Sequence, residues 1–161
     1  MRTTVVLAVL VLSGMSGAAR AAPVTPSQAE ALGGAFRARY GGGVLVRFRA
    51  DRGGASFLGR FASAPLGGDP VAAAWRFIER ESAILGAVDP RGSLRVERTV
   101  ALGRWTAVRF RQTAGGLPVI GRGLVVVADG DGRVCQAAGG LAGVGAIAGG
   151  FALSASEAAA A

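Results

Sequence analysis

The stretch LRVERTVALGRWTAVRFRQTAGGLPVIGRGLVVVADGDGRVCQAA, residues 94–138, decides the fold. Its apolar and polar residues alternate, since Val108 and Phe110 are interleaved with Arg109 and Arg111. Alternation with a period of two is typical of a strand that buries one face and leaves the other in water. The stretch therefore predicts β-structure with one buried face.

Turn sequences divide this stretch into strands. Gly103, the pair Gly115-Gly116 and the run 129–132 are typical of tight turns between antiparallel neighbours. In the first strand, Leu94, Val96 and Val100 alternate with Arg95, Glu97 and Thr99, which is typical of a strand. The segment 117–128 is almost wholly apolar after its arginine, which predicts a strand covered on both faces. Together the segments indicate an antiparallel meander.

A strong helix precedes the meander. Asp69 is a typical N-cap, Pro70 suits the first helical position, and Gly86 is a plausible C-cap, so one helix is predicted between them. Trp75 and Ile78 lie on its apolar face, and both are expected in the core. The fold class is therefore α+β, with one main helix packed on an antiparallel meander.

A shorter helix and a hairpin are predicted before the main helix. Ser27-x-x-Glu30 has the form of a capping box, and apolar residues recur from there at helical spacing as far as Tyr40. Residues 44–49 alternate as a half-buried strand does, and residues 56–61 are predicted to pair with it.

The composition excludes several classes of active site. The chain has 161 residues, no histidine and one cysteine. It therefore lacks the means for Ser-His-Asp or Cys-His catalysis, an HExxH zinc site, a disulfide framework or a cysteine-based cluster. Asp129 and Asp131 resemble the beginning of a calcium loop, but no glutamate follows at the required distance and a hairpin turn is the preferred interpretation. We expect no catalytic, cofactor-binding or metal-binding residue in this chain.

The basic charge is not by itself evidence for a nucleic-acid partner. The formal net charge is +8, and all 18 basic residues are arginines, which is typical of a GC-rich coding sequence. The arginines are scattered along the sequence, and aromatic residues make up only 6%. Nucleic-acid binding favours clustered basic residues with interleaved aromatics, so we expect no such partner.

Residues 1–21 are predicted to be a signal peptide. Arg2 precedes the apolar run Val5–Leu12, and Ala19-Arg20-Ala21 places small residues where a signal peptidase reads them. The run is shorter than the ~20 residues that span a bilayer. We therefore expect export to the periplasm or the extracellular space, no membrane association after cleavage, and a monomer.

Three segments carry a resemblance to a known family. DPVAAAWRFIERESAILGAVDPRGSLRV, VRFRQTAGGLPVIGRGLVVV and DGDGRV resemble the FTP domain, the propeptide module of fungalysin- and thermolysin-type zinc metalloproteases. LSASEA, from Leu153, resembles the opening of the PepSY module, which usually follows FTP. The residues that match the family's most specific motif are Arg109, Phe110, Gln112, Thr113, Gly116, Leu117, Pro118, Val119 and Gly121.

The resemblance implies a domain organisation. It consists of a signal peptide (1–21), an N-terminal propeptide segment (22–66), an FTP-like propeptide domain (67–140), a Gly/Ala-rich linker (141–152) and the truncated start of a PepSY-like helix (153–161). A segment as short as the last is not a stable helix alone, so we expect this chain to be the front of a longer precursor.

The resemblance also implies a function. The chain would be the non-catalytic propeptide portion of a secreted thermolysin-like zinc metalloprotease precursor, acting as intramolecular chaperone and inhibitor of the protease domain, in cis or in trans. Zinc and calcium would belong only to that protease domain. Two alternatives stay open: a stand-alone exported inhibitor or binding module acting in trans, and a polyanion-binding envelope protein.

A partner interface is a further hypothesis. Trp105, Arg109 and Arg111 are predicted to share one strand face, and an exposed tryptophan beside arginines is typical of interface hot spots. A plain solvated face is the alternative. Residues 116–118 are interpreted as a hairpin corner, and Cys135 as a buried thiol.

Overall fold

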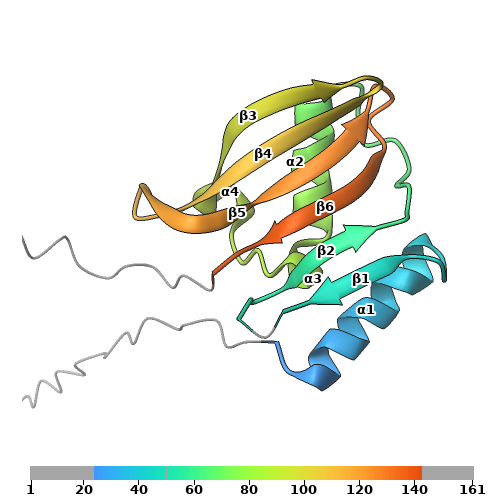
Figure 1. Cartoon of the computed structure of the whole chain (residues 1–161), viewed down its shortest axis with the longest axis vertical. Helices are drawn as coiled ribbons and strands as arrows, with labels where there is room; N and C mark the ends of the chain where they lie inside the picture. Colours follow the sequence, from blue (N-terminus) through green and yellow to red (C-terminus); the bar gives the residue numbers. More distant parts are fainter. Residues whose placement is uncertain (1–23, 50, 143–161) are drawn as a thin grey trace, which may run out of the picture.

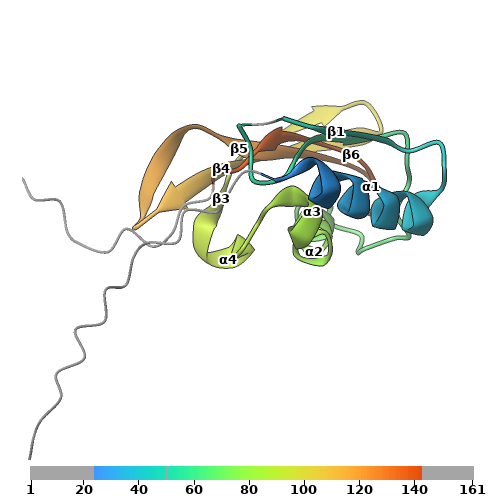
Figure 2. The ribbon, with the colours of Figure 1, turned by 90° about the horizontal axis from the view of Figure 1, so that it is seen from below.

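The protein is a six-stranded antiparallel sheet with helices on one face (Figures 1 and 2). The computed structural model describes residues 24–49 and 51–142, and the predicted signal peptide and PepSY-like helix lie outside these ranges. The strand order is β1-β2-β6-β5-β4-β3, so the predicted α+β class is confirmed. The elements are α1 (Pro26–Tyr40), β1 (Leu45–Phe48), β2 (Ala55–Gly59), α2 (Pro70–Arg80), α3 (Ser82–Leu85), α4 (Pro90–Ser93), β3 (Leu94–Leu102), β4 (Trp105–Ala114), β5 (Leu117–Asp129) and β6 (Val134–Gly140).

The meander forms through the predicted turns. Gly115 and Gly116, with φ of +57° and +84°, connect β4 to β5 in a two-residue loop whose positive φ angles match the twist of the strands. Between β5 and β6 the Asp129 carboxylate accepts hydrogen bonds from the amides of Asp131 (3.0 Å) and Arg133 (2.8 Å). The turn interpretation of both segments is confirmed.

The main helix is shorter than expected. Asp69 caps α2 by accepting from the amide of Ala72 at 2.8 Å, as predicted, but α2 ends at Arg80. Glu81 leaves the helical conformation (φ −102°, ψ 22°), and α3 then runs to a left-handed Gly86. The predicted single helix is thus two, and α1, with 15 residues, is longer than α2, with 11.

The first helix begins two residues earlier than predicted. Thr25 is the N-cap, because its hydroxyl accepts from the amide of Gln28 and the Gln28 side chain accepts from the amide of Thr25. Pro26 occupies the first helical position, where a missing N–H costs nothing. The predicted Ser27-Glu30 capping box is therefore wrong, and the Thr25-Gln28 box two residues earlier caps the helix.

The helices cover only one face of the sheet, so the prediction that residues 117–128 are covered on both faces is wrong. In β5, Leu124, Val126 and Ala128 are buried while Val125 and Val127 are only half-buried, so the strand is not covered on both faces. The helices all lie below the sheet in Figure 2, and nothing described covers the other face.

The first meander strand is also more exposed than its alternation suggested. In β3 only Leu94 is buried, whereas Val96 and Val100 are 41% and 40% exposed. β3 is the edge strand of the sheet, and α2 contacts β4, β5 and β6 instead. Val96, opposite Phe110, lies on the helix side of the sheet but beyond α2, whereas the shift at Glu97 places Val100 opposite Ala107, on the face away from the helices.

The core lies between the sheet and α2. Phe77 and Ile78 of the helix are fully buried against Phe110, Leu124 and Val126 of the sheet. Trp75, expected in the core, is only partly buried. Its ring packs edge-on to Phe110 with centroids 4.8 Å apart, and the Arg91 guanidinium lies 4.3 Å from its centroid. The core prediction thus holds fully for Ile78 and in part for Trp75.

The N-terminal hairpin belongs to the same sheet as the meander. β2 pairs with β6 through Phe57↔Ala138 and Leu58↔Ala137, and β1 pairs with β2. The first helix is held by Glu81, which is 5% exposed and accepts hydrogen bonds from Arg39 (2.6 Å) and the Tyr40 hydroxyl (2.8 Å). The predicted helix and hairpin therefore join the meander in one sheet and one core.

The ionisation of Tyr40 reports on the contact between the end of α1 and Glu81. Burial, and then the hydrogen bond to Glu81, raise the pKa of Tyr40 to about 12 from 10.0. It is the only tyrosine of the chain, so the near-ultraviolet absorbance of tyrosinate measures it alone. We expect a titration midpoint near 12 in the folded chain. The unfolded state loses this proton first, so the contribution of Tyr40 is complete below pH 10 and disappears as the pH rises through the folded pKa.

The Glu81→Gln variant provides the matched control for this titration. Glutamine keeps the size of the side chain and removes its charge, so the midpoint should move towards the ordinary tyrosine value. A midpoint at the ordinary value in the unchanged chain would show that Tyr40 is not held by Glu81.

Candidate interaction groove

A groove of about 940 Å³ crosses one face of the sheet. It is the face opposite the helices, which lie below the sheet in Figure 2. Residues from both the N-terminal hairpin and the meander line it. The lining residues that the argument uses are Arg47, Arg49, Arg52, Arg109, Arg111, Arg122, Glu97 and the segment 118–121.

Strand alternation places the groove arginines on this face. Arg47 in β1 is paired with Phe57 of β2, and both line the groove. In β4, Phe110 points to the core and is 1% exposed, so its neighbours Arg109 and Arg111 point to the open face, where they are 52% and 50% exposed. The same alternation that builds the core therefore builds the basic surface.

Glu97 holds two of these arginines together. The pairing of β3 with β4 shifts between Val96 and Arg98, which leaves Glu97 at a bulge. Its carboxylate pairs with Arg109 at 2.7 Å and also with Arg111. The hydrogen bond from Arg111 is the main cause that lowers the pKa of Glu97 below 4.5, and the charge of Arg109 adds to it. Glu97 is therefore ionised at neutral pH and fixes both guanidinium groups.

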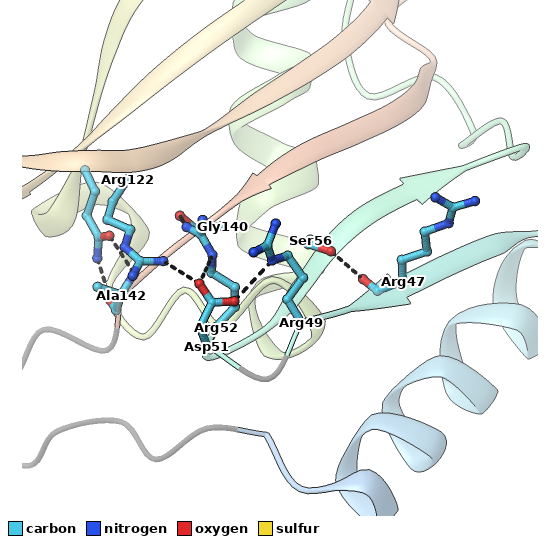
Figure 3. Close-up of polar contacts among 9 residues, drawn as sticks. Arg47, Arg49, Asp51, Arg52, Ser56, Arg122, Gly140 and Ala142 are labelled. Atoms are coloured by element: carbon cyan, nitrogen blue, oxygen red, sulfur yellow. Dashed lines mark hydrogen bonds and ion pairs between the residues drawn. The ribbon is translucent and has the colours of Figure 1, made fainter.

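Asp51 holds a second set at the other side of the groove (Figure 3). Its carboxylate lies 3.1 Å from Arg49, 3.2 Å from Arg52 and 3.9 Å from Arg122. Although desolvation opposes it, the hydrogen bond from Arg49 and the surrounding positive charge lower the pKa of Asp51. The Arg52 guanidinium also donates to the carbonyl of Gly140 at 3.3 Å, which connects the first hairpin to the end of β6.

The segment 118–121 forms the rim of the groove. The β4–β5 pairing jumps from Arg111↔Gly123 to Thr113↔Pro118, so the intervening residues of β5 bulge away from the ladder. Gly121 lies at φ +69°, a conformation that glycine adopts without strain. Ile120 is 95% exposed as a result. The rim therefore offers apolar surface beside the arginines.

Gln112 anchors the chain where it leaves the sheet. Its side chain is 2% exposed, donates to the carbonyl of Ala142 at 2.7 Å and accepts from the amide of Ala142 at 2.8 Å. Two hydrogen bonds from one buried amide fix this exit point against the β4–β5 bulge. Leu141, next to it, is 1% exposed.

The proposed interface residues do not form one patch. Arg109 and Arg111 lie together in the groove, bridged by Glu97. Trp105 shares their strand face but sits at the far end of β4, where Arg104 lies 4.7 Å from its ring centroid, and it does not line the groove. The interface hypothesis itself stays a prediction.

Sequence reasoning missed four groove arginines: Arg47, Arg49, Arg52 and Arg122. They are scattered in the sequence, as noted above. The β2–β6 pairing brings Arg47, Arg49 and Arg52 towards Arg109 and Arg111, and the β4–β5 pairing places Arg122 beside them. The alternation of residues 44–49 already placed Arg47 and Arg49 on one strand face. What the sequence did not contain was the position of that strand in the sheet.

Other candidate features are accounted for locally. Cys135 is half-buried and not buried as predicted, and burial raises the pKa of its thiol, which lowers the fraction present as the reactive thiolate. Within residues 24–49 and 51–142, no group of three or more acidic, cysteine or histidine residues is placed to hold a metal ion. Among the helices described, none has the length and apolarity that crossing a membrane requires.

Comparison with known families identifies the meander. Residues 93–141 match the family model described as the Fungalysin/Thermolysin Propeptide Motif, FTP. This segment is similar to that motif. Searches of curated proteins and of solved structures give no significant match. The FTP motif is non-catalytic and indicates a propeptide of thermolysin- or fungalysin-type proteases, which are secreted enzymes.

The FTP motif coincides with one half of the groove. It spans β3 to β6, and it contributes Arg109, Arg111, Glu97 and the rim segment 118–121 to the lining. The other half of the groove comes from residues 47–57, which precede the motif. The groove is therefore shared between the FTP motif and the hairpin before it.

Proposed function

We propose that this chain is the non-catalytic propeptide portion of a secreted thermolysin-like zinc metalloprotease precursor, and that it acts as intramolecular chaperone and inhibitor of the protease domain. The observation that carries the proposal is the FTP motif at residues 93–141. Zinc and calcium would be bound by the protease domain, not by this chain.

The physical basis is selective binding to the native protease domain. A partner that binds the folded state, and not the unfolded one, lowers the free energy of the folded state by mass action. A covalent connection raises the effective concentration of that partner, and its cleavage removes the advantage. The same binding delays activity until the connection is cut, which protects the producing cell.

The action is tested by adding the purified chain to a thermolysin-type catalytic domain from the same genome. We expect a higher yield of active enzyme on refolding from denaturant. With the chain at about ten times its Kd, hydrolysis by an already folded domain should fall about tenfold when binding blocks the cleft. An unrelated protein of equal net charge is the control. If neither yield nor rate changes, the chain is not such a propeptide.

The reading frame distinguishes action in cis from action in trans. A downstream continuation that encodes PepSY residues and HExxH supports a precursor acting in cis. A stop codon directly after Ala161 supports a separate inhibitor acting in trans. Both share the protease domain as the partner.

A further inference from the structure

We propose that the groove binds an extended acidic segment of the partner protease domain. The inference rests on the proposed function for the identity of the partner, and on the described residues for the chemistry. Six arginines line the groove, and the carboxylates paired with them are Glu97 and Asp51. This leaves an excess of four positive charges on one face of the sheet.

Five of the six arginines are held in place before any ligand arrives. Glu97 fixes Arg109 and Arg111, and Asp51 gathers Arg49, Arg52 and Arg122. A side chain that is already ordered loses less conformational entropy when it binds. Each guanidinium group has five N–H donors, so one protein carboxylate leaves donors for another.

Two of these donors lack an acceptor. The Nε of Arg52 and an Nη of Arg122 are buried and have no hydrogen-bond partner among the described residues. Arg52 Nε lies 3.2 Å from Asp51, within ion-pair distance but without the alignment of a hydrogen bond. An unpaired buried donor is costly, so Arg52 and Arg122 keep unused hydrogen-bonding capacity beside the groove.

The shape of the groove suits an extended segment. It crosses β1, β2, β6, β5 and β4, and glycines of β5 and β6 line part of it. Five strands spaced ~4.8 Å apart measure roughly 20 Å across, about the length of six extended residues. Glycine leaves the backbone open to close approach.

The lining favours a mixed peptide over a continuous polyanion. Glu97 and Asp51 would repel a uniformly charged sulfated glycan or nucleic acid that lay along the whole groove. Pro118, Val119 and the 95% exposed Ile120 offer apolar contacts at the rim. A segment in which carboxylates alternate with apolar residues matches both features.

The test compares two charge-matched double variants of the full chain. Arg47→Gln/Arg109→Gln removes one arginine from each side of the groove, and Arg37→Gln/Arg60→Gln removes two exposed arginines outside it. The probe is a fluorescein-labelled peptide in which glutamate alternates with valine, followed by anisotropy. We expect the groove variant to bind about tenfold more weakly and the control variant to stay within about twofold of the unchanged chain. Thermal unfolding checks that both variants fold.

The outcomes separate the groove from the proposed function. Equal losses in both variants, or tight binding of a heparin oligosaccharide with no binding of the peptide, overturn the groove proposal. If the groove variant aids refolding of the protease domain as well as the unchanged chain does, the proposed function stands and the groove is overturned. If the peptide binds but the unchanged chain leaves the protease domain unaffected, the protease is overturned as the partner while the acidic-ligand chemistry is supported.

Discussion

Replacing Phe110 by alanine is expected to lower the free energy of unfolding by about 3–5 kcal/mol. Phe110 is 1% exposed and packs edge-on to Trp75 of α2, at the centre of the contact between helix and sheet. Alanine would lose the burial of the ring and leave a cavity that the surrounding strands can fill only in part. Denaturant unfolding, followed by tryptophan fluorescence, measures the change.

Ile120→Ala is the matched control for this truncation. Ile120 belongs to the next strand of the same hairpin but is 95% exposed, so its loss should change the stability by less than about 0.5 kcal/mol. Similar effects of the two variants would contradict the assignment of Phe110 to the core. Because Phe110 lies between Arg109 and Arg111, its loss should also weaken binding of the acidic peptide.

Gly132→Ala is expected to destabilise the fold by at least about 2 kcal/mol. Gly132 has φ +74°, where a side chain is strained, and an added Cβ would overlap the carbonyl oxygen of Gly67. The Gly132 carbonyl also accepts from the amide of Leu66 at 2.9 Å, so the β5–β6 turn is attached to the segment before α2. The turn that precedes β6 would have to move away from residues 66–67.

Two further glycine variants separate the causes. Gly130 lies in the same turn and has open space around it, so Gly130→Ala should change stability by less than about 0.5 kcal/mol. Gly103, at φ +62°, also has open space, so Gly103→Ala measures the backbone strain alone, about 1–2 kcal/mol. In the same unfolding assay, Gly132→Ala must lower the free energy of unfolding by more than Gly103→Ala does. Equal losses would show that the contact with Gly67 is not tight.

Helix starts and turns that depend on neighbouring residues could be predicted from the sequence. Asp69 before Pro70 marked the start of α2, and Gly115-Gly116 marked the β4–β5 turn. The prediction of Ser27 as N-cap was wrong, because Thr25 also has a capping-box partner, Gln28, three residues later. The break at Glu81 was also missed, because the residues that hold Glu81 come from the end of α1, over 40 positions away in the sequence.

Several residues that line the groove could be placed on their strands from the sequence, but their assembly into one groove could not be predicted. Arg109 and Arg111 were placed on the open face from the alternation in β4, and the motif segment 118–121 was identified by resemblance. Their meeting with Arg47 depends on the pairing of β2 with β6, which joins residues about 80 positions apart in the chain. No pattern within either hairpin specifies that neighbour. The exposure of Val96 likewise depends on how far α2 extends over the sheet.

The strand order carries a consequence for the timing of folding. β6, the final strand described, lies inside the sheet between β2 and β5, so it joins the two hairpin systems. On a ribosome, or in a channel that passes the chain N-terminus first, the early hairpin has no neighbour until residues 134–140 emerge. Contacts this distant in sequence form late and slowly. The two hairpin systems therefore join into one sheet only when almost all of its strands have been delivered.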